Sequence, residues 1–183
     1  MELDKKVIDF PRGIRVTVGD ITKMKVDAIV NAANESLLGG GGVDGAIHAA
    51  AGHGLLEECK TLGGCKTGHC KMTGAYDLPC RKIIHAVGPN CQVMTVAMAE
   101  PLLRSCYEEA MKLARENGLN SIAFPCISAG IFKYPKSDAA TVALETISEA
   151  IDNGYEGEVT ICCFSEEDMV AYERAAHRIA RGE

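Results

Sequence analysis

The sequence predicts an α/β protein, a three-layer α/β/α sandwich with a central mixed, largely parallel sheet. Short apolar segments rich in β-branched residues alternate with longer segments of helical period, and this alternation places helices on both faces of a sheet. The composition is typical of a globular chain, with 47% hydrophobic and 24% charged residues. No internal repeat or composition break divides the 183 residues, so we expect one domain over residues 1–183.

Five segments are expected to form strands, because each is short, apolar and bounded by Gly, Pro, Asp or Asn. These segments are residues 14–18, 26–30, 82–87, 121–124 and 159–164. In open α/β sheets, ligands bind beyond the carboxyl ends of the strands. The loops that leave these segments are therefore the expected binding region.

Helical period and capping residues predict the main helices. One helix begins near Val43, and another begins near Pro101 and stops at residues 117–118, which are Asn-Gly. A third spans residues 137–154, and the last begins at Ser165, whose hydroxyl can cap the first turn. The last helix is expected to present four side chains to the core: Met169, Tyr172, Ala176 and Ile179.

Charge and hydropathy exclude several classes of function. A net charge of −6 argues against an extended nucleic-acid partner, since such affinity depends on clustered Lys and Arg. No apolar run approaches the roughly 20 residues that span a bilayer, and the start of the chain lacks the apolar core of a secretory signal. We therefore expect a cytoplasmic monomer with no membrane partner.

The cysteines are interpreted as reduced thiols. There are nine of them, but the count is odd and no CxxC pair occurs, so they predict no disulfide framework. Small buried hydrophobic groups are the expected role. Cys59, Cys65, His69 and Cys70 could be drawn as a metal cluster, yet their spacing matches no structural zinc pattern. Neither a metal nor another cofactor is expected.

The loop after the first expected strand carries Asp20, followed by Ile21 and Thr22. A carboxylate at the end of a strand can accept a hydrogen bond from an exocyclic amine such as adenine N6. A turn or capping role for Asp20 is the alternative, and for this loop taken alone it is the favoured one.

A run of four glycines, residues 39–42, follows the second expected strand and its Asn-rich end at residues 31–34. Each glycine adds backbone freedom that folding must remove, so the run needs a reason. One such reason is close approach of the backbone to a ligand, because a chain without Cβ atoms can wrap around a phosphate or sugar. The helix that begins near Val43 would direct its unpaired N–H groups at the same anion. A plain flexible loop is the alternative.

Asp44 lies in the first turn of that helix, where the helix dipole is expected to lower the pKa of its carboxyl group. A carboxylate beside a bound anion is useful if it orients a water molecule or a ribose hydroxyl. An Asp that only stabilises the first turn is an equal alternative. His48, one turn later, can touch Asp44, although such a histidine is more often structural.

The loop after the fourth expected strand includes residues 128–132, Ser-Ala-Gly-Ile-Phe. Ser-Ala-Gly predicts a tight turn whose amides suit a second phosphate, and Phe132 offers an apolar face for a sugar ring. Phe132 as a core aromatic is the alternative. His85, in the third expected strand, is interpreted as a packing or supporting residue.

In this order, the segments resemble the macrodomain family, and within it the MacroD-type branch of O-acetyl-ADP-ribose deacetylases and mono-ADP-ribosyl hydrolases. The resemblance spans nearly the whole chain. It lies in residues 19–22, 26–34, 37–48, 62–68, 83–89 and 124–132. A glycine run alone is weak evidence, whereas these ordered segments together are highly specific.

The resemblance implies a macrodomain-like fold with a cleft for ADP-ribose. Asp20 and the Ile21 amide would hold adenine. Asn34 and Asp44 would face the distal ribose as the catalytic residues, and Phe132 would line that ribose. The two glycine-rich loops would hold the diphosphate through Gly41, Gly42, Val43, Ser128, Ala129, Gly130 and Ile131. A water molecule near the diphosphate would attack the ester on the distal ribose, assisted by Asp44.

The expected function is hydrolysis of ester-linked ADP-ribose, in O-acetyl-ADP-ribose or on Asp and Glu side chains of ADP-ribosylated proteins. A reader module that binds ADP-ribose without turnover is the main alternative, and the pairing of Asn34 with Asp44 favours the hydrolase. A phosphatase acting on ADP-ribose-1″-phosphate would use the same cleft, as a side activity at best.

One position departs from the family pattern. The second phosphate loop of the family commonly has a glycine where this chain has Lys133. If the backbone needs a positive φ there, a lysine is strained by about 1 kcal/mol. We expect Lys133 to affect the rate and the specificity of the reaction more than the fold.

Overall fold

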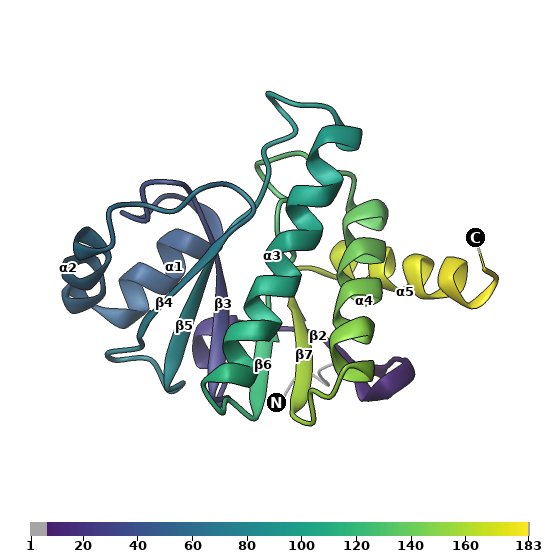
Figure 1. Cartoon of the computed structure of the whole chain (residues 1–183), viewed down its shortest axis with the longest axis horizontal. Helices are drawn as coiled ribbons and strands as arrows, with labels where there is room; N and C mark the ends of the chain where they lie inside the picture. Colours follow the sequence, from purple (N-terminus) through teal and green to yellow (C-terminus); the bar gives the residue numbers. More distant parts are fainter. Residues whose placement is uncertain (1–6, 183) are drawn as a thin grey trace.

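The computed structural model describes residues 7–182, and one seven-stranded sheet runs through them (Figure 1). Its spatial order is β1-β2-β7-β6-β3-β5-β4. The strands are β1 (Val7–Asp9), β2 (Arg15–Val18), β3 (Ala28–Ala33), β4 (Cys70–Gly74), β5 (Lys82–Val87), β6 (Ser121–Phe124) and β7 (Glu158–Cys163). The five central strands are parallel, and only β1 and β4 at the edges are antiparallel to their neighbours. The mixed, largely parallel sheet was predicted correctly.

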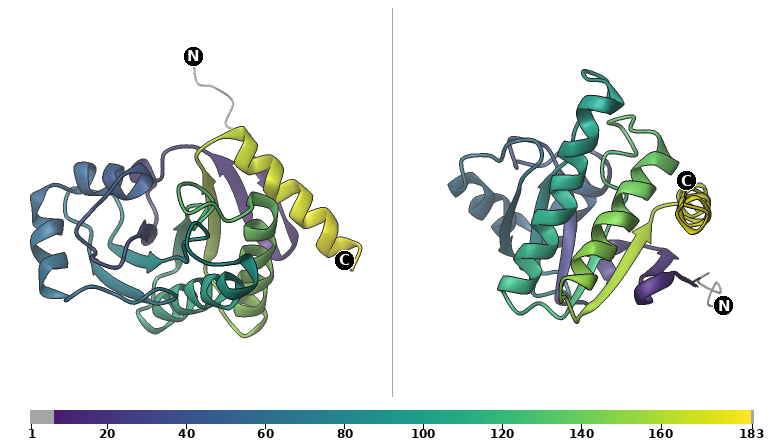
Figure 2. Two further views of the ribbon diagram at one scale, coloured as in Figure 1. Left: turned by 90° about the horizontal axis from the view of Figure 1, so that it is seen from above. Right: turned by 45° about the vertical axis from the view of Figure 1, so that its right-hand side comes forward.

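Helices cover both faces of this sheet, which confirms the three-layer sandwich. They are α1 (Gly42–Ala51), α2 (His53–Thr61), α3 (Val96–Glu116), α4 (Lys136–Asp152) and α5 (Glu166–Ala180), with short 3-10 turns η1 (Pro11–Gly13) and η2 (Ile21–Lys23). Helices α3 and α4 lie side by side over one face (Figures 1 and 2). Helix α5 packs against α4, and α1 with α2 cover the opposite face.

Alternating strand residues build a separate core on each face, as the twofold period of a strand requires. Side chains such as Val30, Ile84 and Phe124 pack under α3, α4 and α5. Their neighbours Ile29 and Ile83 pack under α1 and α2. A strand residue that is polar is therefore assigned to one helix layer or the other by its place in the alternation.

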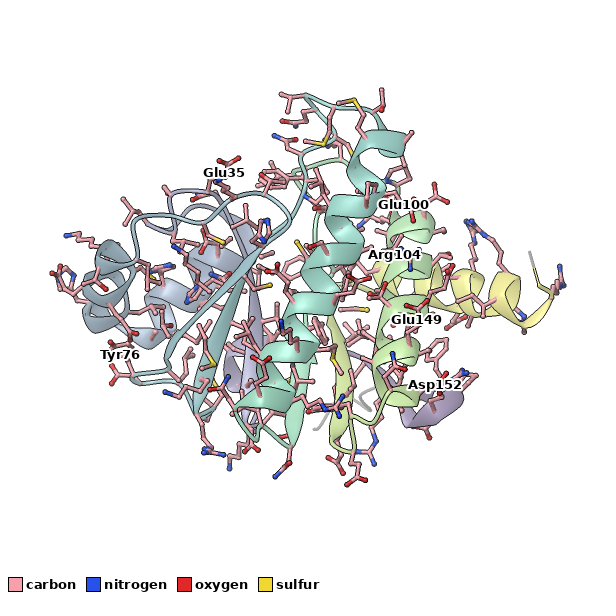
Figure 3. All side chains as sticks on the ribbon, in the orientation of Figure 1. Glu35, Tyr76, Glu100, Arg104, Glu149 and Asp152 are labelled. Carbon is pink, nitrogen blue, oxygen red and sulfur yellow. The ribbon has the colours of Figure 1, made fainter. Side chains whose placement is uncertain are left out.

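Ion pairs join the helices at the surface. Arg104 of α3 lies 3.0 Å from Glu100 one turn earlier and 3.7 Å from Glu145 of α4. Figure 3 shows Arg104 on the side of α3 that faces α4, between Glu100 and Glu149. Such exposed pairs contribute little to stability, about 0–1 kcal/mol each. The arrangement of the layers rests on the two apolar cores.

Several element boundaries differ from the predictions. Helix α3 starts at Val96, a turn before Pro101, because the hydroxyl of Thr95 accepts a hydrogen bond from the Met98 amide and caps the helix. Strands β1 and β4 and helix α2 were not predicted. Strand β4 is a mostly half-buried edge strand, so its sequence lacks the apolar run of a central strand.

The prediction for the last helix was partly wrong. Ser165 caps α5 by accepting from the Asp168 amide, and Met169 and Tyr172 are buried. Ile179 is 39% exposed, because the C-terminal part of α5 extends beyond the sheet that it would have to cover (Figure 1).

None of the nine cysteines, all of which lie within residues 7–182, is in a disulfide bond, and six of them are buried. Within residues 7–182, no group of three or more His, Cys, Asp or Glu side chains is placed to hold one metal ion. In the same part of the chain, no helix is long and apolar enough to cross a membrane.

Candidate functional site

A cleft of about 1050 Å³ opens at the carboxyl ends of the parallel strands, where the loops that leave β2, β3, β6 and β7 come together. This is the place that the sheet rule predicts. All of the predicted site residues line it: Asp20, Ile21, Asn34, Gly41, Gly42, Val43, Asp44, Ser128, Ala129, Gly130, Ile131 and Phe132. The structure therefore brings together residues that lie more than a hundred positions apart in the sequence.

The glycine run forms the rim of the cleft and leads into α1, which begins at Gly42 as predicted within one residue. Gly41 at the N-cap has no side chain, so no side chain caps the helix. Gly45 packs so closely on the run that a Cβ atom there would lie 2.5 Å from the carbonyl oxygen of Gly40. The first amides of α1 thus face the cleft beside the loop, an arrangement suited to an anion.

Asn34 holds this loop in shape through both ends of its amide. Its Nδ2 donates to the Gly39 carbonyl at 3.0 Å, and its Oδ1 accepts from the amide and the hydroxyl of Ser36 at 3.1 and 2.6 Å. The side chain is half-buried and lines the cleft. Asn34 is therefore a structural residue of the loop as well as a residue at the predicted reaction centre.

Asp44 is buried, with 4% of its surface exposed. Its Oδ1 accepts from Asn31 Nδ2 at 2.8 Å and lies 3.5 Å from His48 Nε2. Its Oδ2 lies next to Gly40, where a Cβ atom would be 3.2 Å from Oδ2 and 3.3 Å from Asn34 Nδ2. Oδ1 is thus hydrogen-bonded to the sheet, and Oδ2 lies beside the glycine loop at the rim of the cleft.

The pKa of Asp44 is raised, mainly by burial, and the hydrogen bond from Asn31 and the charge of His48 offset only part of this. The prediction that the helix dipole lowers this pKa was wrong. The dipole favours the ionised form, but removing a carboxylate from water disfavours it more strongly. The raised pKa is a common property of carboxyl groups at reaction centres.

Behind Asp44 lies a short chain of buried polar groups that reaches across the sheet. Asn31 of β3 is fully buried, and its Nδ2 also lies 3.1 Å from Nδ1 of His85 in β5. The other ring nitrogen of His85 lies 2.9 Å from the hydroxyl of Thr73 in β4. Asn31 and Thr73 were not predicted as site residues. The signal for Asn31 was available, because alternation from Ile29 places it on the face that α1 covers.

The second loop closes the opposite rim. Ser128 and Lys133 have φ of 64° and 59°, so the backbone does require the left-handed region at the lysine that departs from the family pattern. Ile131 is 65% exposed and reaches across to Gly41, where a Cβ atom would lie 3.9 Å from its Cδ1. Phe132 is half-buried against the cleft, and its carbonyl accepts from the Cys91 amide at 2.7 Å.

At the other end of the cleft, Asp20 is exposed and caps the turn η2. Its Oδ1 accepts from the amide and the hydroxyl of Thr22 at 3.0 and 2.6 Å. The hydroxyl of Thr22 is the main cause of the lowered pKa of this carboxyl group. The capping interpretation is therefore correct, and it is compatible with ligand binding, since both of these hydrogen bonds involve Oδ1.

The loop after β7 also lines the cleft and was missed as part of the site. It contributes Phe164, which is 91% exposed, and the start of α5 at Ser165. An aromatic side chain so exposed buries almost no apolar area in the free protein. The same strand-end rule that identified the other loops would have found this one, because residues 159–164 were predicted as a strand.

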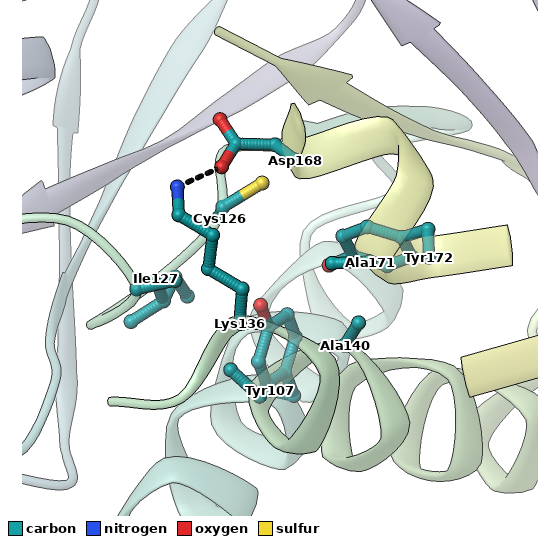
Figure 4. Close-up of a pocket in the computed structure, with 10 residues that line it drawn as sticks. Tyr107, Cys126, Ile127, Lys136, Ala140, Asp168, Ala171 and Tyr172 are labelled. Atoms are coloured by element: carbon teal, nitrogen blue, oxygen red, sulfur yellow. Dashed lines mark hydrogen bonds and ion pairs between the residues drawn. The ribbon is translucent and has the colours of Figure 1, made fainter. Parts of the chain in front are cut away.

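The inner wall at this end separates the cleft from a small cavity of about 10 Å³ (Figure 4). Lys136 of α4 pairs with Asp168 of α5 along this wall, and the pair raises the pKa of Lys136. Cys126 lies beside them, 3.9 Å from Cys163 between the sulfur atoms. The ion pair ties the two helices together where the cleft meets the core.

Known proteins are similar to this chain in sequence and in architecture. Residues 30–143 match the Macro domain family. A Macro domain-containing protein of Mesorhizobium japonicum is 51% identical over 170 residues, which cover 92% of this chain and 96% of that relative. The ADP-ribose glycohydrolase MACROD2 of Mus musculus is 50% identical over 158 residues, which cover 85% of this chain. This chain spans 33% of the length of the mouse protein. A Trypanosoma brucei macrodomain, solved in complex with ADP-ribose, matches with a TM-score of 0.82 and 43% identity, over 89% of this chain and 68% of that one.

Proposed function

This chain belongs to the Macro domain family, and from that membership and the geometry of the cleft we propose that it binds ADP-ribose and hydrolyses its esters. The substrates are O-acetyl-ADP-ribose and proteins that carry ADP-ribose on Asp or Glu. A relative that is 50% identical bears the name ADP-ribose glycohydrolase, and a structural neighbour was solved with ADP-ribose. Both support the same ligand.

The observation that carries the proposal is the placement of Asp44. A reader module needs donors for the diphosphate, but it has no use for a buried carboxylate of raised pKa at the rim of the same loop. In the proposed reaction, Oδ2 of Asp44 holds the attacking water or the distal ribose hydroxyl, since Oδ1 is held by Asn31. Water adds across the ester, giving a carboxylic acid and an ADP-ribose hydroxyl.

The remaining roles follow the shape of the cleft. The amides at the start of α1 and those of residues 128–131 bind the diphosphate. Asp20 accepts from the adenine amine, and the Ile21 amide binds the same base. Asn34 and Phe132 contact the distal ribose. These assignments are proposals, supported by the position of every one of these residues on the cleft wall.

Incubation of the purified protein with O-acetyl-ADP-ribose, and separately with a protein mono-ADP-ribosylated on Glu, tests the proposal. We expect release of free ADP-ribose or acetate over many turnovers, measured by chromatography. Calorimetric titration with ADP-ribose is expected to show saturable binding. Binding without turnover of either substrate would support the reader alternative, and the absence of binding would refute both.

The cytoplasmic location and the single domain over residues 1–183 remain predictions. Nine cysteines without a disulfide bond among residues 7–182 accord with a reducing compartment. One sheet that includes strands from both ends of the described chain accords with a single domain.

A further inference from the structure

Four polar residues on one face of the sheet form a line that ends at Asp44. Thr73, His85 and Asn31 come from the neighbouring strands β4, β5 and β3, and Asn31 and His85 are register partners. Their exposed fractions are 2%, 0% and 0%. Groups buried this completely keep the hydrogen bonds that they have, because no solvent replaces a lost partner.

The donors and acceptors along this line fix its direction. The Thr73 hydroxyl lies 3.0 Å from the Gly74 carbonyl, which can only accept, and 2.9 Å from His85 Nε2. With its one hydrogen donated to the carbonyl, the hydroxyl accepts from His85, and we assign the ring proton to Nε2 on this basis. Nδ1 is then an acceptor, which receives Nδ2 of Asn31 at 3.1 Å. Burial lowers the pKa of His85 to about 4, which keeps the ring neutral.

The orientation of the Asn31 amide follows from this direction. Its NH₂ group serves two acceptors, Asp44 Oδ1 and His85 Nδ1, while its own oxygen is buried with no partner in the described part of the chain. The oxygen therefore does not select the orientation. With the amide reversed, that oxygen would face a carboxylate oxygen and an unprotonated ring nitrogen, so three acceptors would meet with no hydrogen between them.

We propose that Thr73 and His85 are positioning residues for the reaction: together they hold the Asn31 amide with its NH₂ group toward Asp44, which leaves Oδ2 of Asp44 aimed at the cleft. This inference rests on the proposed hydrolase function. This proposal agrees with the sequence interpretation of His85 as a packing or supporting residue and gives it a defined task, to hold the Asn31 amide through its ring tautomer.

Loss of the Thr73 hydroxyl tests the direction of the line. In Thr73→Val, the Nε2 proton of His85 would be buried without an acceptor, so the ring moves its proton to Nδ1. The Asn31 amide then turns its oxygen toward His85 and loses the hydrogen bond to Asp44. The titratable groups nearest Asp44 are His48 of α1, whose Nε2 lies 3.5 Å from Oδ1, and Cys59 of α2. His85 of β5 lies behind Asn31, and Glu58 acts on Cys59 and His85. The Cys59 thiol is only a weak donor, and His48 Nε2 is already at the same oxygen in the parent protein, so neither group is a full substitute for the lost bond.

We expect kcat for O-acetyl-ADP-ribose to fall about tenfold in Thr73→Val, with KM and ADP-ribose affinity unchanged. The acid limb of the kcat profile should move to higher pH, because Asp44 has lost a donor that favours its ionised form. Thr73→Ser keeps the hydroxyl and should restore both the rate and the profile. Thr146→Val is the matched control, since Thr146 is equally buried but lies in α4. Its activity and pH profile should equal those of the parent protein.

Nitrogen-15 NMR of the His85 ring tests the same inference without an assay of activity. We expect Nε2 to carry the proton in the parent protein and Nδ1 to carry it in Thr73→Val. A proton on Nδ1 in the parent would overturn the proposal, as would an unchanged rate and acid limb in a folded Thr73→Val protein. If the parent protein shows no turnover, the hydrolase function is refuted. The positioning role is then tested by NMR alone, through the position of the ring proton of His85 and the titration of the Asp44 carboxyl group.

Discussion

The two ends of the cleft each present an aspartate, and the two are built in opposite ways. Asp44 is buried, is held by a side chain from the sheet, and has its pKa raised by burial. Asp20 is exposed, is held within its own turn, and has its pKa lowered mainly by the Thr22 hydroxyl. In the proposed function, one residue type thus serves two tasks. Burial suits the end where bonds change, and exposure suits the end where a ligand is recognised.

Replacing the buried aspartate should have the largest effect. In Asp44→Ala we expect the rate of ester hydrolysis to fall about 100-fold while ADP-ribose still binds, because the lost group assists the reaction and does not anchor the anion. Single-turnover kinetics and calorimetry measure the two quantities. Asp138→Ala is the control, since Asp138 also lies in a first helical turn but pairs with Arg178 away from the cleft. Equal rates in both variants would contradict the assignment.

The shape of the glycine loop can be altered without touching a polar group. Gly45→Ala places a methyl group 2.5 Å from the Gly40 carbonyl oxygen, so the loop must move away from α1. We expect kcat/KM to fall about 30-fold, although alanine favours the helix itself. The control Gly74→Ala adds a methyl group with no neighbour closer than 3.6 Å. A gain of stability in Gly45→Ala with full activity would show that the loop tolerates the shift.

At the open end, Asp20→Ala should weaken ADP-ribose binding about tenfold and leave kcat at saturation nearly unchanged, because the hydrogen bond to the base and the cap of η2 are lost away from the reaction centre. Calorimetry and steady-state kinetics together test this separation. Lys23→Ala, in the same turn but outside the cleft, should bind as the parent protein does. A drop in kcat without a loss of affinity would reverse the roles of the two ends.

Phe164→Ala tests whether the exposed aromatic ring packs against the bound ligand. Because Phe164 is 91% exposed, its loss should leave the melting temperature of the free protein unchanged. We expect ADP-ribose affinity to fall about fivefold, since a ring that packs on the bound ligand gains its burial only in the complex. A lower melting temperature with unchanged affinity would mean that the ring has a structural role instead.

The smallest expected effect concerns the strained rim. Lys133 has a φ of 59°, so Lys133→Gly should raise the free energy of unfolding by about 1 kcal/mol. Lys133→Ala keeps the Cβ atom, and with it the strain of the backbone at positive φ, so it should leave the stability unchanged. Denaturant titration of the three proteins checks this. If Ala stabilises as much as Gly does, the charge of the lysine and not its backbone is the cause.

Much of the site could be predicted because its loops follow strands, and strand ends have clear sequence signals. Residues 82–87 and 121–124 were predicted with the observed boundaries. The carboxyl-end rule then placed Asp20, the glycine run and residues 128–132 together. Strand β4 could not be predicted in this way, because an edge strand needs only half of its residues to be apolar.

The electrostatics of Asp44 could not be predicted from the sequence. Its place in a first helical turn suggests a lowered pKa, whereas its burial depends on how closely α1 packs against β3. That distance is set by residues from both elements, among them Ile47 and Ile29. The role of Thr73 was hidden for a similar reason, since it depends on a strand that the sequence pattern did not reveal.

The proximity of Ile131 to Gly41 has a consequence for how a ligand enters and leaves the cleft. The side chain of Ile131 comes close to Gly41 on the opposite rim, so a ligand that occupied both ends of the cleft would have to pass this side chain. With 65% of its surface exposed, Ile131 loses little packing when it rotates. Such rotations take picoseconds to nanoseconds. We therefore expect product release to require the rotation of this one side chain and no movement of the backbone of either loop.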